Sequence, residues 1–501
     1  MRVFAGKILG ILFGIAAGWL CSCTADVPAD AQQSKDKALI YPDYSRITVP
    51  YNIAPLNFYI DMRADRYIVC IEGQDNSRIV MKGPEIKIDP DKWKKLLANN
   101  KGKSYTVTVY LLQNGKWKAL APFTNSISDY PVDTYLSYRL IEPGYVRYDR
   151  LWLVQRDLTS FKEHVIYNNL QDYKANEMQC INCHSFQNYK TDNMQFHARA
   201  YKGGTIIVSN GKPEKINIKT DSLPGAGQYP AWHPTKQLIA YSVNRTRQLF
   251  HSIDPQKVEV MDSESDLVLY NIENNHVQII RNDSDELETY PSWSPDGKWL
   301  YYSTAHIKTN GQNASDFFSE HYKDIKYNIN RIPFNGDSLT FGAAQTIVNA
   351  ASNGKSALLP RISPDGKWLL YSLADYGTFH IWHKSSDLYV KNLDNGNEYE
   401  LDNANSPDSE SYHSWSSNGR WIVFTSRRDD GSYSRLYLAY FSPQGEVSKA
   451  FVIPQEKPLH NAFFMKSYNI PEFTVEPVTV SLRQFSKAIR KDAKQAVHES
   501  R

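Results

Sequence analysis

The stretch YPSWSPDGKWLYYSTA, residues 290–305, decides how most of this 501-residue chain is predicted to fold. Its Ser-Pro-Asp-Gly core is typical of a type I turn, because proline fixes φ at the second position and glycine follows the aspartate. The residues after the turn, KWLYYST, predict a buried strand rich in aromatic side chains. The stretch therefore indicates a turn that leads directly into a buried β-strand.

This pattern recurs three more times. The copies are YPAWHPTKQLIAYSVN (229–244), LPRISPDGKWLLYSLA (359–374) and YHSWSSNGRWIVFTSR (412–427), so that successive starts lie 61, 69 and 53 residues apart. A repeat of hairpins predicts a β-propeller, in which four-stranded blades bury their faces against one another. We assign residues 201–475 to this propeller and expect about five or six blades. The spacing exceeds the usual ~40–50 residues per blade, so some loops must be enlarged.

The region before the propeller also has a β pattern. Residues 46–157 contain about six short runs with alternating apolar residues, among them RYIVCIEG and SYTVTVYLL, separated by turn-forming residues. This pattern predicts a β-sandwich of immunoglobulin or fibronectin type. The whole chain is therefore expected to be mainly β, with this sandwich followed by the propeller.

The two ends of the chain have different compositions. Residues 1–22 combine Arg2 and Lys7 with a short apolar core, which is typical of an export signal. Leu20-Cys21-Ser22-Cys23 resembles a bacterial lipobox, which predicts a lipid on Cys23 and a flexible tether over 23–45. Acyl chains contribute ~0.8 kcal/mol per buried CH2 and anchor a protein without spanning the bilayer. At the other end, residues 476–501 place apolar and basic residues on separate faces of a predicted amphipathic helix.

Residues 158–200 lack a period of two, and we expect loops and short helices there. In their middle stands Cys180-Ile181-Asn182-Cys183-His184. C-x-x-C-H is the attachment motif of c-type haem: the two thiols bond to the vinyl groups, and the histidine becomes the proximal iron ligand. Export agrees with this interpretation, because haem is attached outside the cytoplasm. We therefore expect one covalent haem c on Cys180, Cys183 and His184.

Three alternatives stay open for this motif. A disulfide between the two cysteines is compatible with an exported protein, although no thioredoxin-like βαβ pattern flanks it. Zinc bound by the cysteines with His184 or His197 lacks a second ligand pair nearby. The third alternative is a motif that carries no group. Of the other thiols, Cys70 lies in a strand-like run and is expected to be buried.

If haem is bound, its iron needs a distal ligand. Met194 and His197 follow His184 by ten and thirteen residues, and His233 replaces the serine that other repeats carry. Methionine ligation would raise the reduction potential and bis-histidine ligation would lower it. We favour His197, then Met194.

The WSPDGKWLYYS copies resemble the PD40 or WD40-like repeats of TolB-type propellers. With the preceding CxxCH, the chain is similar to exported TolB-like lipoproteins of Bacteroidetes that carry a single c-type haem motif. The resemblance implies a protein partner on a propeller face, and a place on the periplasmic side or the surface of the outer membrane. A near-neutral net charge of +3 without long charged runs does not favour nucleic acid as a partner. No hydrolase or transferase motif was found.

Two functions follow from these expectations. The first is an electron-transfer lipoprotein whose haem exchanges electrons with a redox protein bound to the propeller. The second is a binding or scaffold lipoprotein in which Cys180 and Cys183 are structural.

Overall fold

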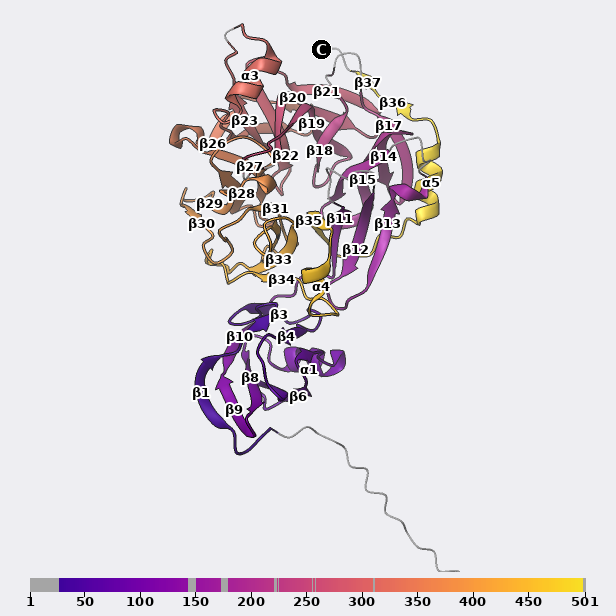
Figure 1. The fold of residues 1–501 in the computed structure, drawn as a ribbon. Helices are drawn as coiled ribbons and strands as arrows, with labels where there is room; N and C mark the ends of the chain where they lie inside the picture. Colours follow the sequence, from indigo (N-terminus) through magenta and orange to yellow (C-terminus); the bar gives the residue numbers. More distant parts are fainter. Residues whose placement is uncertain are drawn as a thin grey trace, which may run out of the picture.

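The computed structural model describes residues 27–142, 150–172, 179–219, 223, 225–254, 256, 258–309 and 311–498. The signal segment and Cys23 lie outside the described residues. Among those that are described, no helix is long and apolar enough to cross a membrane. The chain forms a small N-terminal unit and a large propeller-like body in which sheets succeed one another around a common centre (Figure 1).

The N-terminal unit contains two sheets and one helix. Its seven-stranded sheet has the order β1-β9-β8-β10-β3, with β5 paired to β8 and β6 paired to β5. These strands are β1 (Gln32–Lys37), β3 (Thr48–Pro50), β5 (Arg66–Gly73), β6 (Arg78–Lys82), β8 (Ser104–Gln113), β9 (Lys116–Ala121) and β10 (Phe123–Ser128). The three-stranded sheet contains β2 (Ile40–Tyr41), β4 (Phe58–Ile60) and β7 (Glu85–Ile86), and the helix is α1 (Pro90–Asn99). The immunoglobulin or fibronectin type of this unit stays a prediction.

Six sheets surround the centre of the large body, and each begins with an innermost strand. Two sheets hold the ends of this region: β35 (Ser467–Thr474) with β11 (Tyr135–Ile141), β12 (Leu151–Asp157) and β13 (Glu163–Asn168), and β14 (Gln179–Gln187) with β15 (Lys190–Ala200), β16 (Gly204–Ser209), β17 (Lys212–Asn217) and β36 (Lys494–Gln495). The third contains β18 (Gly227–Trp232), β19 (Leu238–Phe250), β20 (Val258–Asn271), β21 (His276–Arg281) and β37 (Val497–His498).

The other three sheets contain the remaining strands. They are β22 (Glu286–Trp293), β23 (Trp299–His306), β24 (Asn328–Asn335), β25 (Thr340–Phe341) and β26 (Gln345–Val348); then β27 (Ser356–Ile362), β28 (Trp368–Ala374), β29 (Asp387–Asn392) and β30 (Glu398–Glu400); then β31 (Glu410–Trp415), β32 (Trp421–Ser426), β33 (Arg435–Tyr440) and β34 (Phe451–Val452). Short helices connect some of them: α3 (Ala314–His321), α4 (His460–Phe463), α5 (Leu482–Arg490), η1 (Asn169–Gln171), η2 (Ala351–Asn353) and η3 (His380–Trp382).

The predicted turn explains how each repeat starts its second strand. Ser294 Oγ accepts a hydrogen bond from Trp299 N at 3.0 Å and donates to Asp296 Oδ1 at 2.6 Å, while Gly297 takes φ +69°. Glycine adopts this left-handed φ without steric cost. In the first copy His233 replaces the serine, and its Nδ1 accepts from Thr235 N and Lys236 N at 3.2 and 3.0 Å. His233 is therefore a turn residue in this fold.

Three predicted boundaries are wrong. The tether over 23–45 includes β1, which pairs in parallel with β9 as an exposed edge strand and carries the Asp36–Lys118 ion pair. The sandwich does not reach residue 157, because β11 and β12 pair with β13 and β35. The described residues between 158 and 200 are mainly strands, not loops and short helices. β15 is buried along most of its length, so it shows no alternation of apolar and polar residues.

The C-terminal helix is shorter than the predicted 476–501. It has a capping box at Ser481 and Gln484 and ends at Arg490. Phe485, Ala488 and Ile489 are buried, and α5 packs on the sheet that contains β16 and β17. The chain then extends and adds β36 to β17 and β37 to β21. The apolar pattern that predicted a longer helix continues beyond Arg490. The residues there pair instead with the free edges of β17 and β21.

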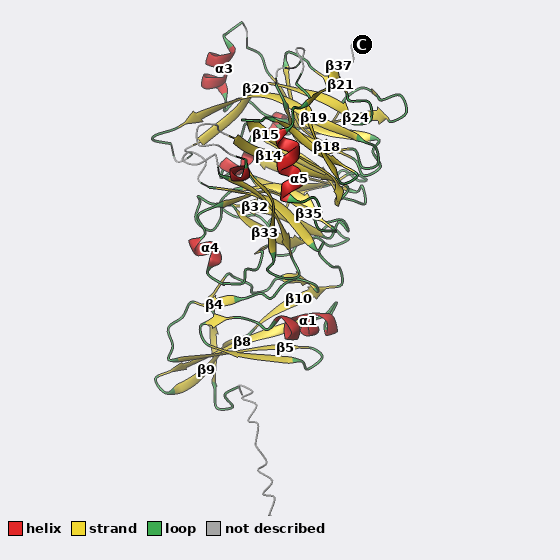
Figure 2. Cartoon of the chain, turned by 90° about the vertical axis from the view of Figure 1, so that its right-hand side faces the viewer, coloured by secondary structure: helices red, strands yellow, loops and turns green. Residues whose placement is uncertain are grey.

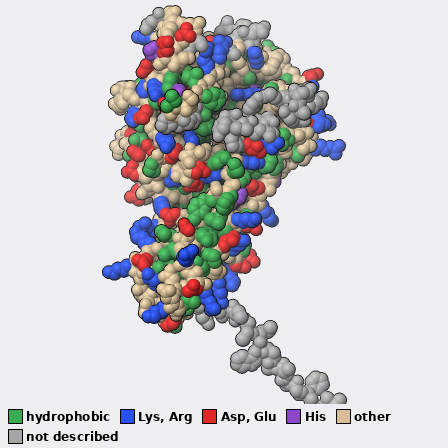
Figure 3. Space-filling view, viewed as in Figure 1, with side chains coloured by type: hydrophobic (Ala, Val, Ile, Leu, Met, Phe, Trp, Pro, Cys, Tyr) green, Lys and Arg blue, Asp and Glu red, His purple; other side chains and the backbone are tan. Residues whose placement is uncertain are grey.

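The N-terminal unit lies against the edge of the large body that holds β33 and β34 (Figures 1 and 2). Asp133 accepts hydrogen bonds from Ser417 N and Oγ at 2.7 and 2.5 Å. Asn418 Nδ2 donates to Pro131 O at 2.7 Å. Apolar side chains are visible near this junction in Figure 3, and one apolar cluster contains buried residues of both parts.

Candidate functional site: the central cavity and the CxxCH strand

The CxxCH motif lies on β14, the innermost strand of its sheet. The pairing of β14 with β15 shifts between Asn182 and Ser185, where Cys183 adopts φ +52°. A bulge of this kind re-aims the side chains that follow it. Positive φ is unusual for cysteine, so the backbone conformation of Cys183 is set by its surroundings.

The same bulge occurs on all six innermost strands. The six residues with positive φ, at 47° to 59°, are Cys183, Tyr229, Tyr290, Leu359, Tyr412 and Ile470. Each lies at a register shift between its strand and the neighbouring one. We call the four residues that start there the axial motif: CHSF, YPAW, YPSW, LPRI, YHSW and IPEF. Cys183 and His184 are thus the first two residues of a sixth copy of the propeller repeat.

His184 has a close counterpart in His413, which holds the same second position. Both imidazoles are buried, and burial is the main cause that lowers the pKa of each to about 3. In both cases backbone groups of the preceding sheet's first-position residue oppose this shift, Ile470 for His184 and Leu359 for His413. His413 Nε2 lies 2.8 Å from Leu359 O, whereas His184 Nε2 has no hydrogen-bond partner.

The two thiols are separate in this structure. Cys70, Cys180 and Cys183 are free, and burial raises the pKa of the Cys180 thiol. Cys70 is buried, as predicted. Within the described part of the chain, no group of three or more His, Cys, Asp or Glu side chains could hold a metal ion. The disulfide and the zinc site therefore receive no support from the geometry of these residues.

The surroundings of His184 allow a test of whether a haem fits. The cavity next to it, lined by Arg139, Leu153, Asn182 and Phe196 among others, has a volume of about 10 Å³. Pockets that hold drug-sized ligands have volumes of about 300 to 1,000 Å³. The residues as folded here do not fit a haem group.

The predicted distal ligands are already engaged. Met194 pairs with Phe186 across the strands and is fully buried in an apolar cluster. His197 pairs with Asn182, and its Nδ1 lies 3.1 Å from Thr205 Oγ1. Burial lowers the pKa of His197 to about 3.

A cavity of about 540 Å³ lies where the carboxyl ends of the six innermost strands meet. All six sheets contribute to its wall through the third and fourth positions of the axial motif. The third positions are Ser185, Ala231, Ser292, Arg361, Ser414 and Glu472, and the fourth positions are Phe186, Trp232, Trp293, Ile362, Trp415 and Phe473. We call this space the central cavity. Its wall is aromatic, with an ionisable side chain, Arg361 or Glu472, at two of the six third positions.

Three polar atoms in this wall are buried and have no hydrogen-bond partner: Ser185 Oγ, Trp232 Nε1 and Glu472 Oε2. The contrast with the other tryptophans is informative. Trp293 Nε1 donates to Ala231 O at 3.0 Å and Trp415 Nε1 donates to Arg361 O at 3.1 Å. Buried polar atoms in folded proteins are almost always satisfied, so orphaned ones beside a cavity indicate a binding site.

The loop between β28 and β29 contacts the first-position rings of two of these strands, those of Tyr229 and Tyr290. The hydroxyl groups of Tyr290 and Thr378 form a hydrogen bond of 3.1 Å, so this loop contacts the side chain of Tyr290, a first-position residue. His383 Nε2 lies 3.0 Å from Glu259 Oε1, and both side chains are buried. This last contact connects the residue that follows η3 to the beginning of β20.

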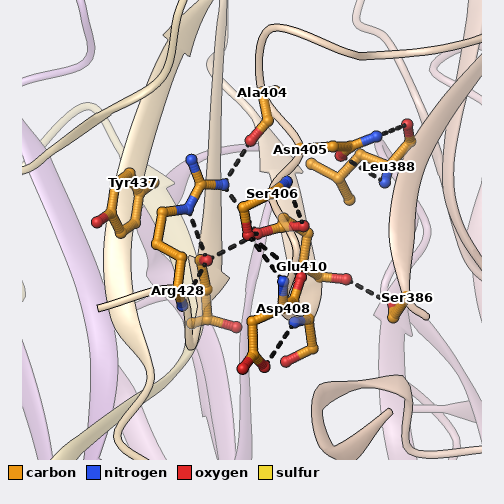
Figure 4. A network of polar contacts seen from close by, with 12 residues as sticks. Ser386, Leu388, Ala404, Asn405, Ser406, Asp408, Glu410, Arg428 and Tyr437 are labelled. Atoms are coloured by element: carbon orange, nitrogen blue, oxygen red, sulfur yellow. Dashed lines mark hydrogen bonds and ion pairs between the residues drawn. The ribbon is translucent and has the colours of Figure 1, made fainter. Parts of the chain in front are cut away.

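A second polar cluster, near β31 and β32, has a different character (Figure 4). Glu410 accepts hydrogen bonds from Ser406 Oγ and Ser426 Oγ, each at 2.7 Å, and pairs with Arg428 at 2.8 Å. Arg428 also lies over the Tyr437 ring. Both charges are compensated within the protein, so this cluster is a structural ion pair.

Sequence reasoning missed the residues of the central cavity. The turn and strand of each repeat do not indicate them, because they come from the four residues before each turn. The sequence does contain a signal: Arg361 stands where the other three repeats have Ala231, Ser292 and Ser414. Glu472 was harder to find, since IPEF is not followed by the turn and strand of the other copies.

No protein-family model matches the chain, and no curated protein matches it. Similar solved structures include prolyl oligopeptidase B from Galerina marginata bound to a substrate, at 10% identity and a TM-score of 0.36, over 78% of this chain and 54% of that one. An ACO/RPE65 chimera matches at 10% identity and a TM-score of 0.37, over 87% and 97% of the two chains. The chain spans about half the length of the oligopeptidase. At these TM-scores the description as propeller-like depends on the arrangement of the sheets themselves.

Proposed function

We propose that this protein is a binding protein of the cell envelope that captures its ligand in the central cavity. In this proposal the six sheets are the blades of a TolB-like propeller, a lipid on Cys23 holds the protein on a membrane, and the CxxCH cysteines are structural. It is the second of the two functions expected from the sequence.

The observation that carries the proposal is the central cavity, with three unpartnered polar atoms in an aromatic wall. A larger groove of about 750 Å³ lies elsewhere, between the β29–β30 turn and residues 443–447. None of its described side chains has a buried polar atom without a partner, and two of them are already bonded: Tyr399 Oη donates to Gly445 O at 2.7 Å and Asn403 Nδ2 donates to Val447 O at 3.0 Å. The central cavity is therefore the better candidate for a ligand.

The electron-transfer function has weaker support. Free thiols at Cys180 and Cys183 and the unpartnered Nε2 of His184 favour it. Against it stand the volume of about 10 Å³ beside His184 and the equivalence of Cys183-His184 with five other copies of the axial motif. The chain should be expressed in a host with haem-attachment machinery. We expect no Soret band and no haem-sized mass increment; both appearing together would reinstate electron transfer.

Ligand capture is tested by calorimetry with two probe sets, oligosaccharides from envelope glycans and short synthetic peptides. We expect saturable binding of at least one probe. Ala231→Phe fills the cavity and should abolish binding, whereas Ala343→Phe in an exposed loop should leave it unchanged. Absence of binding by both sets, or equal binding by the two variants, would contradict the proposal. Membrane anchoring is tested separately, since Cys23→Ser should release the protein from the membrane fraction.

A further inference from the structure

Arg361 carries a positive charge that no acidic side chain among the described residues pairs with directly. Within the described part of the chain, its guanidinium makes a single hydrogen bond, from Nη1 to the carbonyl of its neighbour Pro360 at 3.3 Å. Burial lowers its pKa, and Glu472 and Tyr189 oppose that shift only from a distance. An arginine desolvated in this way is costly unless a partner compensates its charge.

Elsewhere in the protein, an arginine with a purely structural role has a direct acidic partner. Glu410 is buried and Arg428 is partly buried, and they form a direct ion pair at 2.8 Å with further hydrogen bonds to Glu410 (Figure 4). Arg361 and Glu472 face the same cavity and form no such pair. Burial raises the pKa of Glu472 to about 8, so at neutral pH this carboxyl is protonated and leaves the charge of Arg361 uncompensated.

The side chains of the cavity wall indicate which class of anion the cavity can bind. One guanidinium matches one carboxylate through two parallel N–H···O bonds. The rest of the wall is apolar or weakly polar, with Trp232, Trp293 and Trp415 presenting flat aromatic surfaces. A ring that carries hydroxyl groups matches such indoles, and its hydroxyls match Trp232 Nε1 and Ser185 Oγ, two of the three unpartnered polar atoms of this wall.

We infer that the central cavity binds an acidic sugar, with its carboxylate on Arg361 and its ring stacked among the tryptophans of the fourth position. The inference rests on the proposed function, because it names the ligand class of the same cavity. A peptide with a terminal carboxylate shares the anion but lacks the ring of hydroxyls, and it is the alternative that the experiment separates.

The experiment measures binding of a trigalacturonate and of the matching neutral trisaccharide to the full chain by calorimetry. We expect the acidic sugar to bind at least about tenfold more tightly, which corresponds to ~1.4 kcal/mol. Arg361→Gln should remove this preference. Arg331→Gln, at a surface arginine that stacks on Trp299 outside the cavity, should retain it. Arg361→Lys keeps the charge and loses the two-pronged geometry, so an intermediate preference is expected even if the glutamine variant folds poorly.

The pH dependence provides a second readout. Besides one another, Glu472 and Arg361 interact electrostatically with Tyr189 on the β14–β15 turn and His413 on β31, and Lys190 also lines the cavity. Ionisation of Glu472 above about pH 8 places a negative charge near Arg361, so binding of the acidic sugar should weaken there. Glu472→Gln should abolish this loss.

The outcomes separate the two proposals. Binding of a peptide through its terminal carboxylate, with no binding of the acidic sugar, would overturn this inference and leave the proposed function standing. Equal binding of the acidic and neutral sugars would also overturn it. Absence of binding by sugars and peptides alike would overturn both.

Discussion

The second position of the axial motif accepts two kinds of side chain. It is proline in four copies and histidine in two, His184 and His413. We predict that His184→Pro folds with a free energy of unfolding within about 1 kcal/mol of the wild type. The reason is that Tyr229, Tyr290 and two other left-handed residues already precede a proline in this conformation. Urea unfolding measures the difference.

A matched control for this substitution is Ile207→Pro, in the middle of β16. Ile207 is paired with β15 on one side and β17 on the other, so proline there removes a hydrogen bond from the ladder. We expect this variant not to fold. If His184→Pro were equally damaging, His184 would have a role that the other five copies lack.

Glu472 should also make the stability of the protein depend on pH. Its pKa is about 8 in the folded protein, because of burial, against an ordinary 4.5. Between these values the unfolded chain is ionised while the folded protein keeps the proton, so stability falls as pH rises and levels off above about pH 8. Glu472→Gln should reduce the slope of unfolding free energy against pH.

The slope should not vanish in that variant. Burial also raises the pKa of Glu288 on β22 to about 8. Glu288→Gln should therefore reduce the slope as well, yet leave binding in the central cavity unchanged. Superimposable curves for the wild type and Glu472→Gln would show that Glu472 is ionised in the folded protein.

At the scale of elements, the sequence predicted most where the pattern is local. The turn at Ser294-Gly297 and the strand after it occur as expected, because both depend on residues that are close in sequence. β14 was not predicted, because a bulge at Cys183 breaks the alternation of its side chains. β11 and β12 were assigned to the wrong unit, since β35, the strand that pairs with β11, lies more than 300 residues away.

For the candidate site too, local sequence patterns could be interpreted and long-range contacts could not. Cys180, Cys183 and His184 form a local motif with a known chemistry, so they dominated the sequence interpretation. The central cavity combines single residues from six distant strands, and only the fold brings Arg361 and Glu472 to one wall. Their charge stands out once the six copies of the axial motif are aligned.

The C-terminal extension is predicted to protect two sheet edges. β36 and β37 pair with β17 and β21, and Asn275 Nδ2 donates to Gln495 O at 2.8 Å. Truncation after Lys491 removes these strands and leaves α5 in place. We expect faster amide exchange in β17 and β21 and a greater tendency to aggregate, because unpaired edges accept other chains. Unchanged exchange in both strands would show that the extension is not held in solution.

At the scale of the whole molecule, the ring of sheets and the N-terminal unit depend on each other. The ring is closed by β35, a late strand, pairing with β11, which follows directly after the N-terminal unit. Arg156 of β12 is buried and donates to Gln455 Oε1 at 2.8 Å, and Asn57 Nδ2 donates to Glu456 O at 3.0 Å. The segment around residues 454–456 is thus held by both parts.

Asp133 connects the contact between the N-terminal unit and the ring of sheets to the central cavity. Its carboxylate accepts from Ser417 N and Oγ, and Ser417 also lines the cavity. Asp133→Ala removes the partner of both half-buried Ser417 donors, and the loss for fully buried donors, about 1–3 kcal/mol, is the upper bound of the cost. We expect lower stability, faster amide exchange at residues 417–421 and weaker ligand binding. Asp129→Ala, at an exposed neighbour, is the control and should change none of these. If Asp133→Ala lowered stability but left binding intact, the cavity wall would be held by the ring alone, independently of the N-terminal unit.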